Sequence, residues 1–208
     1  EKPLEVAKQF EGAGLRRLHL VDLDGARAGE VKNWKVLEHI TANTSLVVDF
    51  SGGISTRNSV KITFDSGAAY AAVGSIAVTG EELLDEWLAV FGPERFIIGA
   101  DVREEIITIR GWTETTSLTV FDMIEKYKLK GVKQFFCTDV SKDGLLQGPS
   151  TLLYKKILNR QPSIDLIASG GITTIDDIEE LRQARCEGAI IGKALYENKI
   201  SLNDLKRF

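Results

Sequence analysis

The chain has 208 residues, 43% of them hydrophobic and 27% charged, with a formal net charge of −4. A chain of this size buries one sizeable core, so we expect a single domain over residues 1–208. Its slightly acidic balance, without a long run of Lys or Arg, argues against nucleic acid or a membrane surface as partner. The two cysteines form no disulfide framework, which favours a cytoplasmic protein, and a monomer is expected.

Short apolar runs alternate with segments of helical periodicity along the chain. Helices are expected at Pro3–Phe10, Glu81–Val90, Ser117–Lys128 and Thr174–Arg182. Nearly continuous apolar runs are typical of parallel strands that are covered on both faces, and their alternation with helices predicts right-handed crossovers. Seven such strands are expected, at Leu18–Leu23, Leu46–Phe50, Tyr70–Gly74, Phe96–Asp101, Gln134–Asp139, Ile164–Ala168 and Gly188–Gly192.

The sequence repeats itself once. The stretch Ser51–Thr56 (SGGIST) returns as Ser169–Thr174 (SGGITT), and each copy is followed by a glycine that closes an apolar run, Gly74 or Gly192. The repeat predicts an α/β chain of the (βα)8 TIM-barrel class made of two half-barrels, roughly residues 1–92 and 93–208. A doubly wound open sheet is the alternative, and the two-fold repeat favours the barrel.

The number of strands is one short of a barrel. The first expected element is a helix, and the chain is shorter than the roughly 250 residues typical of the fold. We therefore expect the first strand of the barrel and its loop to be missing from this chain.

The repeated glycines stand where strands end and helices begin. At such positions backbone amides can approach an anion closely, and two such turns predict a ligand with two phosphates, bound on one face of the barrel. One site is expected at Gly52, Gly53, Gly74 and Ser75, and the other at Gly170, Gly171, Gly192 and Lys193. The alternative is that these glycines serve only the tight turns of the fold.

Polar residues at the carboxyl ends of the strands are the candidates for chemistry, because the active sites of such barrels lie there. Neither of the two histidines, His19 and His39, stands at a strand end, so acid–base chemistry would fall to aspartates. Asp101 ends an apolar run, where a carboxylate is costly unless it is used. Asp143 precedes a glycine and could equally be an ordinary turn former.

Two further features allow two interpretations each. Asp22 and Asp139 occupy equivalent positions of the two repeats, which also fits a structural role shared by both halves. Trp112 either packs in a loop or offers a stacking surface to a heterocycle.

No metal or cofactor motif is visible. The sequence has no His pair, no paired Cys and no carboxylate cluster at ligand spacing, and it lacks the phosphate-loop and dinucleotide-binding patterns. We therefore expect chemistry without a metal or cofactor on a small bisphosphorylated molecule.

Taken together, the motifs carry a specific resemblance that runs from Glu1 to Phe208. The chain resembles the phosphoribosylformimino-aminoimidazole carboxamide ribotide (ProFAR) isomerases of histidine biosynthesis. The motifs are LHLVDLDGA (Leu18–Ala26), SGGI (Ser51–Ile54), VGS (Val73–Ser75), ADV (Ala100–Val102), RGW (Arg110–Trp112), CTDVSKDGLLQGPS (Cys137–Ser150), ASGGI (Ala168–Ile172) and GAIIGKALYE (Gly188–Glu197).

The resemblance implies an Amadori rearrangement, which turns an N-linked aminoaldose into an aminoketose. Asp101 matches the aspartate usually cast as proton donor, and Asp143 matches a second aspartate to which the acid role is also attributed. The partner base of the family is an aspartate on the first strand, which we expect to be absent from this chain. Residues expected to contact substrate or phosphate also include Arg110, Trp112, Thr138 and Gly144.

Three other functions stay open. The cyclase subunit of imidazole glycerol phosphate synthase shares the duplicated phosphate sites but would require a glutaminase partner. A bifunctional isomerase that also acts on phosphoribosylanthranilate would use the same barrel. A degenerate barrel that binds phosphates without turnover is the non-enzymatic alternative.

Overall fold

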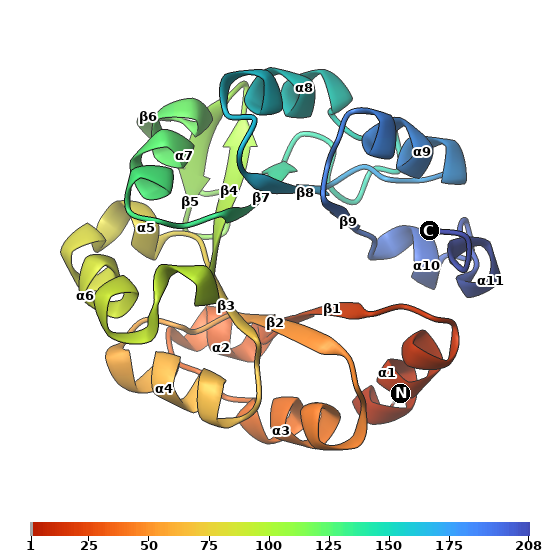
Figure 1. Ribbon diagram of the computed structural model, residues 1–208, viewed down its shortest axis with the longest axis horizontal. Coiled ribbons are helices and arrows are strands. Elements are labelled where there is room, and N and C mark those ends of the chain that lie inside the picture. The colour runs from red at the N-terminus through yellow and green to blue at the C-terminus, as the bar shows by residue number, and fades with distance from the viewer. Residues whose placement is uncertain (1) are drawn as a thin grey trace. The chain divides into compact units, whose positions relative to one another are not determined.

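The computed structural model describes residues 2–208 and is shown in Figure 1. The chain forms two compact units: the first runs up to Ile97 and includes Leu205–Phe208, and the second comprises Ile98–Asp204. The boundary falls inside strand β4 (Phe96–Arg103), close to the boundary predicted from the repeat. That both halves belong to one domain stays a prediction.

The first unit contains a parallel sheet in which the strands follow one another in chain order. Helices α3 and α4 contact each other, and each contacts one strand of this sheet (Figure 1). Its strands are β1 (Arg17–Val21), β2 (Val47–Ser51) and β3 (Tyr70–Val73), and its helices are α1 (Pro3–Gly12), α2 (Leu23–Ala28), α3 (Trp34–Asn43), α4 (Arg57–Asp65), α5 (Ile76–Thr79), α6 (Glu81–Phe91) and the 3-10 turn η1 (Pro93–Arg95).

The second unit continues the same alternation. Strand β4 is followed in the sheet by β7 (Gln134–Asp139), β8 (Asp165–Ser169) and β9 (Gly188–Ile190), and the pairs β7–β8 and β8–β9 are parallel. The helices are α7 (Val120–Leu129), α8 (Thr151–Arg160), α9 (Ile175–Gln183), α10 (Lys193–Tyr196) and α11 (Leu202–Leu205), the last of which ends at the unit boundary.

The repeated motif also sets the start of a helix in each unit. Thr56 accepts a hydrogen bond from the Ser59 amide at the start of α4, and Thr174 does the same for the Asp177 amide at the start of α9. In both cases the side chain of the third helical residue accepts a hydrogen bond from the amide of the capping threonine. These bonds satisfy amides that a helix start otherwise leaves without a partner. Each glycine turn is therefore followed by a firmly capped helix.

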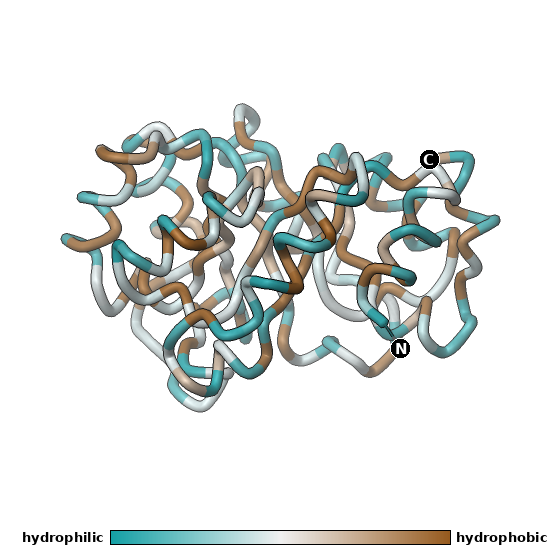
Figure 2. The backbone as a smooth tube through the Cα atoms, turned by 90° about the horizontal axis from the view of Figure 1, so that it is seen from below, coloured by the Kyte–Doolittle hydropathy of each residue, from teal (hydrophilic) through white to brown (hydrophobic). Residues whose placement is uncertain are grey.

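The core forms on both faces of the strands. In β4, the consecutive residues Phe96, Ile97 and Ile98 are all fully buried, as expected for a parallel strand covered on both sides. Tyr154 on α8 donates its hydroxyl hydrogen to the Ser169 carbonyl at 2.7 Å and so joins a helix to β8. The helices alternate hydrophobic and hydrophilic stretches along the tube in Figure 2, as amphipathic helices do.

All seven predicted strands are confirmed, and the differences lie at their ends and in one inserted hairpin. Leu23 begins α2 instead of ending a strand, because Asp22 caps that helix. The helix expected at Ser117–Lys128 begins at Val120. The three residues before it belong to β6 (Glu114–Thr119), which pairs antiparallel with β5 (Ile106–Ile109), and β5 pairs antiparallel with the end of β4.

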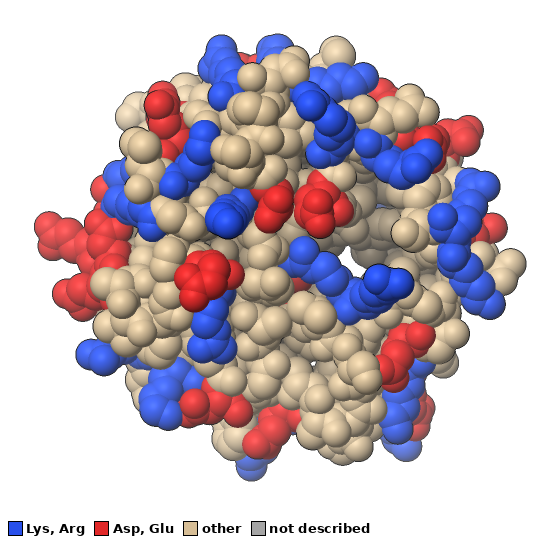
Figure 3. Space-filling view, in the orientation of Figure 1, with Lys and Arg blue, Asp and Glu red and all other residues tan. Residues whose placement is uncertain are grey.

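On the face shown in Figure 3, acidic and basic side chains are interspersed. Such a mixture agrees with the nearly balanced content of 26 Lys and Arg against 30 Asp and Glu. Within residues 2–208, every helix is too short or too polar to cross a membrane.

Candidate active site

The first pair of repeated glycines shapes the turn after β2. Gly52 and Gly53 have φ angles of +97° and +77°, which residues with a side chain rarely adopt. A Cβ atom on Gly52 would overlap the backbone carbonyl of Asp22, at the end of the neighbouring strand β1. The turn after β3, at Gly74 and Ser75, lies beside it, since β2 and β3 are parallel neighbours.

The second pair repeats this arrangement after β8. Gly170 and Gly171 have φ angles of +89° and +79°, and a Cβ on Gly171 would overlap the Gly148 carbonyl. The Gly148 amide also donates to the Gly171 carbonyl at 3.0 Å. Within each unit, the glycine turns therefore lie at the carboxyl ends of adjacent parallel strands, as predicted, but close backbone packing by itself explains the glycines at Gly52, Gly53 and Gly171.

Gly192, between β9 and α10, differs from these glycines. Its φ angle is −110°, and a Cβ at this position would have no atom within 4 Å. Neither left-handed backbone nor packing against the protein requires a glycine here. Gly192 lies between the last strand, β9, and the short helix α10. Barrels commonly bind phosphate after their last strands, at the start of a short helix.

The candidate acid Asp101 stands near the end of β4 and contacts another predicted site residue. Trp112 donates its indole Nε1–H to Asp101 Oδ2 at 2.9 Å. Trp112 is 39% exposed as a residue, so its indole N–H orients the carboxylate while part of the residue stays open to solvent. The structure therefore brings Asp101 and Trp112 together.

The β5–β6 hairpin delivers Trp112 to this contact. Arg110, Gly111 and Trp112 at its tip have φ angles of +54°, +63° and +70°, an uncommon run for residues with side chains. The Arg110 guanidinium donates to Glu114 Oε1 at 2.9 Å and so closes the tip. Backbone conformations of this kind persist where the surrounding structure holds them, often at functional sites.

The other predicted residues lie at the end of the neighbouring strand β7. Thr138 is buried and packs beside Gly170, whose Cβ would stand 3.4 Å from the Thr138 methyl carbon. Asp143 is exposed in the following loop, where its amide donates to the Asp139 carbonyl at 3.1 Å. The ends of β4 and β7 meet, because the Val140 amide donates to the Val102 carbonyl at 3.0 Å.

Asp139 organises the loop that carries Asp143. Its carboxylate accepts bonds from the Ser141 amide and hydroxyl at 3.0 and 2.6 Å, and from the Ser150 hydroxyl at 2.5 Å. Burial raises the pKa of Asp139, but these hydrogen bonds, together with the nearby Lys142 charge, outweigh burial and lower it. Asp139 thus stays ionised and shapes the loop.

Asp22 has the equivalent role in the first unit. The residue is 3% exposed. Its carboxylate accepts hydrogen bonds from the amides of Gly25, Lys32 and Asn33 at 2.9, 2.7 and 2.8 Å, and from the Asn33 side chain at 2.7 Å. Burial raises the pKa of Asp22, but the hydrogen bonds outweigh burial and hold the pKa below its usual value. The structural interpretation of Asp22 and Asp139 is therefore the one that the contacts favour.

We expect Asp22→Asn to lower the free energy of unfolding at pH 7 by about 2 kcal/mol, because an amide NH₂ would face buried N–H donors. A carboxylate whose pKa is lowered by folding stabilises the protein above the unfolded pKa, and this stabilisation is lost as the pH falls through the folded pKa. The free energy of unfolding should be measured with urea at pH 7 and pH 3. The difference in this free energy between wild type and variant should be smaller at pH 3. Asp24→Asn, at an exposed neighbour, is the control, and a difference that is the same at both pH values would contradict the prediction.

Comparison with known proteins identifies the family. The family model described as "Histidine biosynthesis protein" matches residues 1–201. The chain belongs to this family. It is 50% identical over 208 residues to a protein of Parabacteroides distasonis, covering 100% of this chain and 87% of the relative. Relatives from Flavobacterium psychrophilum (48%, 86% of the relative) and Bacteroides thetaiotaomicron (49%, 87%) are matched over the whole chain too.

All three relatives carry the name 1-(5-phosphoribosyl)-5-((5-phosphoribosylamino)methylideneamino)imidazole-4-carboxamide isomerase. The resemblance to the ProFAR isomerases of this family is thereby confirmed, and so is the (βα)8 TIM-barrel class predicted from the strand–helix alternation. The roles of individual residues stay predictions.

One largely buried polar pair was not among the predicted site residues. His19 Nδ1 on β1 hydrogen bonds Asp49 Oδ1 on β2, and the two residues are in register across the parallel pair. The Asp49 carboxylate is 7% exposed. A sequence signal did exist, since each residue is a lone polar residue inside an apolar run, but the pairing depends on strand register, which the pattern of a single strand does not specify.

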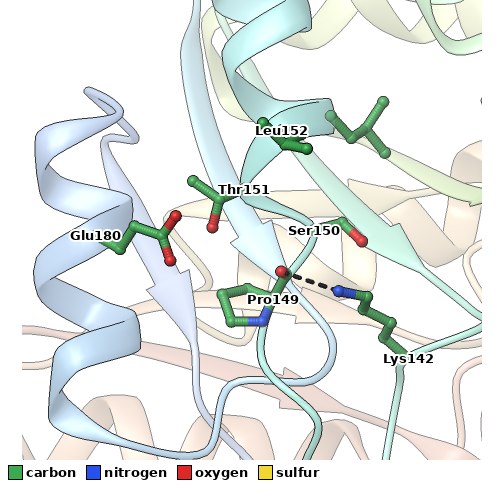
Figure 4. Close-up of a pocket in the computed structure, with 7 residues that line it drawn as sticks. Lys142, Pro149, Ser150, Thr151, Leu152 and Glu180 are labelled. Carbon is green, nitrogen blue, oxygen red and sulfur yellow. Dashed lines mark hydrogen bonds between the residues drawn. The ribbon is translucent and has the colours of Figure 1, made fainter.

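Two depressions of the surface do not include the candidate acids Asp101 and Asp143 in their lining. One cavity of about 390 Å³ lies between the start of α8 and Glu180 on α9, and Lys142 Nζ donates to the Pro149 carbonyl at its edge at 3.2 Å (Figure 4). A second, of about 590 Å³, is lined by residues of α4, α6 and η1 with their neighbours. The strand-end geometry, and not cavity size, therefore locates the candidate site.

Among the described residues, no three or more His, Cys, Asp or Glu side chains are grouped so as to hold a metal ion. The Cys137 thiol on β7 is fully buried. Burial raises the pKa of Cys137, and the nearby Asp101 and Asp139 charges raise it further. This thiol therefore remains protonated and is unsuited to act as a nucleophile.

Proposed function

We propose that this protein is a ProFAR isomerase that catalyses the Amadori rearrangement of a bisphosphorylated aminoaldose to an aminoketose. The observation that carries the proposal is the match to relatives named as this isomerase, at 45–50% identity over essentially the whole chain. The candidate aspartates at the ends of β4 and β7 support it, since this is where active sites of such barrels are found.

In the proposed mechanism, an aspartic acid protonates the ring oxygen of the ribose, and the ring opens to a Schiff base. A base then removes the proton from C2′, and the resulting enolamine collapses to the ketose. Asp101 is the proposed acid. Its hydrogen bond from the Trp112 indole fixes the direction of the carboxyl group, and a fixed donor is a requirement of general acid catalysis.

Asp143 is the alternative acid. It is exposed in the loop that follows β7, and Asp139 shapes the start of this loop. Strand β7 is the neighbour of β4, which carries Asp101. The partner base of this family matches no residue of the present sequence, so the assignment concerns only one half of the acid–base pair. Thr138 and Trp112 would contact the substrate.

Each unit offers one candidate phosphate site, with Gly52, Gly53, Gly74 and Ser75 in the first and Gly170, Gly171, Gly192 and Lys193 in the second. Gly144 is a further candidate for substrate contact. Main-chain amides in turns and at helix starts suit phosphate oxygens. Since packing alone accounts for Gly52 and Gly171, Gly192 is the position at which substrate binding can be tested without disturbing the fold.

We expect Gly192→Ala to raise KM while leaving thermal stability near that of the wild type. A methyl group at this position would meet no protein atom within 4 Å but would block the close approach of a phosphate to the turn. Loss of one or two charge-assisted hydrogen bonds, each worth about 1.5–3 kcal/mol, corresponds to a KM at least tenfold higher. Gly188→Ala on β9, where a Cβ would make ordinary contacts at 3.9 Å, is the matched control. An unchanged KM for Gly192→Ala would remove this turn from the proposed phosphate site.

The direct test of the proposed function is turnover of ProFAR by the complete purified protein, followed by the change in substrate absorbance. Phosphoribosylanthranilate should be assayed beside it, because activity on both would establish a bifunctional isomerase. Tight binding of ProFAR without turnover would instead indicate a phosphate-binding protein and overturn the proposal.

A further inference from the structure

The loop that carries Asp143 is held at both ends by the main chain. At its start, the Asp143 amide donates to the Asp139 carbonyl at 3.1 Å, and at its end the Gly148 amide donates to the turn after β8 at 3.0 Å. Between these points lies Gly144, with a φ angle of +70° and no atom within 4 Å of where its Cβ would stand. The Asp143–Gly144 turn is therefore open to solvent. The Leu145 amide closes it locally by donating to the Lys142 carbonyl at 3.1 Å, and the Gly144 carbonyl is the group through which a distant element can anchor it.

Lys193 holds that carbonyl. Its Nζ donates to the Gly144 oxygen at 2.7 Å across 49 positions of sequence. The same ammonium lies 3.5 Å from Glu197 Oε1, one helical turn further along, but an exposed pair of this kind contributes little. The short bond to Gly144 is the stronger of the two, since a charged donor shortens and strengthens a hydrogen bond.

This contact separates the two parts of Lys193. Its main chain lies at the β9–α10 turn, next to the open Gly192, whereas its ammonium is directed at the loop after β7. The sequence pattern indicated a lysine for phosphate binding, but the side chain is engaged with a carbonyl group in the loop that carries the second candidate acid.

We propose that Lys193 is a positioning residue, whose ammonium fixes the Asp143–Gly144 turn where the Asp143 carboxyl group can transfer a proton. The proposal rests on the proposed function and extends it to a residue outside the reacting groups. An exposed carboxyl group on an open turn must be immobilised to act in proton transfer, since a misplacement of about 1 Å can reduce a rate 10²-fold.

The test compares Lys193→Met, which keeps most of the side-chain length without the charge, with Lys193→Arg, which keeps a charged donor. In the complete enzyme we expect Lys193→Met to lower kcat about 10- to 100-fold with KM changed less than about threefold. Lys193→Arg should recover most of the lost kcat. Lys199→Met, at an exposed lysine just beyond α10, and Glu197→Gln are the controls and should retain wild-type rates. Thermal unfolding should place all four variants near the wild type.

A double-variant cycle identifies the group through which Lys193 acts. If Lys193 acts by placing Asp143, then Lys193→Met should cost nothing further in the Asp143→Asn background, because the group that it places is already disabled. Losses that multiply would mean that Lys193 acts elsewhere, and would overturn the proposal.

Two other results would also overturn it. A higher KM with unchanged kcat in Lys193→Met would make the ammonium a phosphate ligand. Normal activity of Asp143→Asn would leave Lys193 nothing to position, while the isomerase function itself would stand. Failure of the proposed function has a different signature, since the wild-type protein would then show no turnover of ProFAR.

Discussion

Asp101→Asn should reduce kcat for ProFAR by about 10²–10⁴-fold, the usual contribution of a positioned general acid. Asparagine preserves the size of the side chain and can still accept the Trp112 indole hydrogen bond that is 2.9 Å long in the wild type. The variant should therefore fold normally and bind substrate with a KM within a few-fold of the wild type. Steady-state kinetics in the complete protein, together with substrate binding measured by calorimetry, would show the loss in kcat alone.

Asp176→Asn is the control, since Asp176 is an exposed aspartate in the first turn of α9. A kcat near the wild-type value in Asp101→Asn would remove this residue from the mechanism and transfer the acid role to Asp143. If Asp101→Asn and Asp143→Asn are both nearly inactive, the two carboxyl groups act as a unit and their contributions do not add.

Gly52→Ala is the substitution expected to damage the fold most. The φ angle of +97° disfavours any residue with a side chain, and the new methyl group would overlap the Asp22 carbonyl. Because backbone on both sides of this contact is fixed by strands, we expect a loss of about 4 kcal/mol in the free energy of unfolding. In a chain of this length that corresponds to a melting temperature lower by roughly 10 °C or more.

Gly29→Ala separates conformational strain from the overlap. Gly29 also has a positive φ angle, +70°, but a Cβ there would have no neighbour within 4 Å. It should cost only about 1 kcal/mol. Equal losses for the two variants, measured by urea unfolding, would show that the close approach of Gly52 to Asp22 contributes nothing.

The strands and the repeated turns could be predicted from the sequence because their causes are local. A buried parallel strand requires a continuous apolar run such as Phe96–Ala100, and a turn with positive φ angles requires glycine. Both kinds of signal lie within a few neighbouring residues. The candidate site at the strand ends follows from them, since strand ends locate the polar residues of a barrel.

The β4–β5 hairpin, from which the chain continues into β6, could not be predicted because its turn lacks the usual residues. Its two central positions are Glu104 and Glu105, with φ angles of +51° and +71°, where Asn and Gly are strongly preferred. Contacts from distant elements hold this turn, including the bond of 2.6 Å from Lys156 Nζ on α8 to the Glu105 carboxylate. Without the hairpin, the meeting of Trp112 with Asp101 could not be anticipated.

The hydrogen bond of Lys193 to Gly144 was hidden for a related reason. Sequence patterns report which residues follow one another, whereas this contact depends on two loops that meet only after β7, β8 and β9 have paired. The same holds for the four donors around Asp22, two of which come from a single residue, Asn33.

The glycine turns have a consequence for the ancestry of the chain. Gly52 is shaped by Asp22 within the first unit, and Gly171 is shaped by Gly148 within the second. Each unit also has its own loop-organising aspartate and its own threonine cap. A gene segment encoding one half therefore contains everything needed to build one such turn, so a single duplication and fusion event would produce two such turns at once.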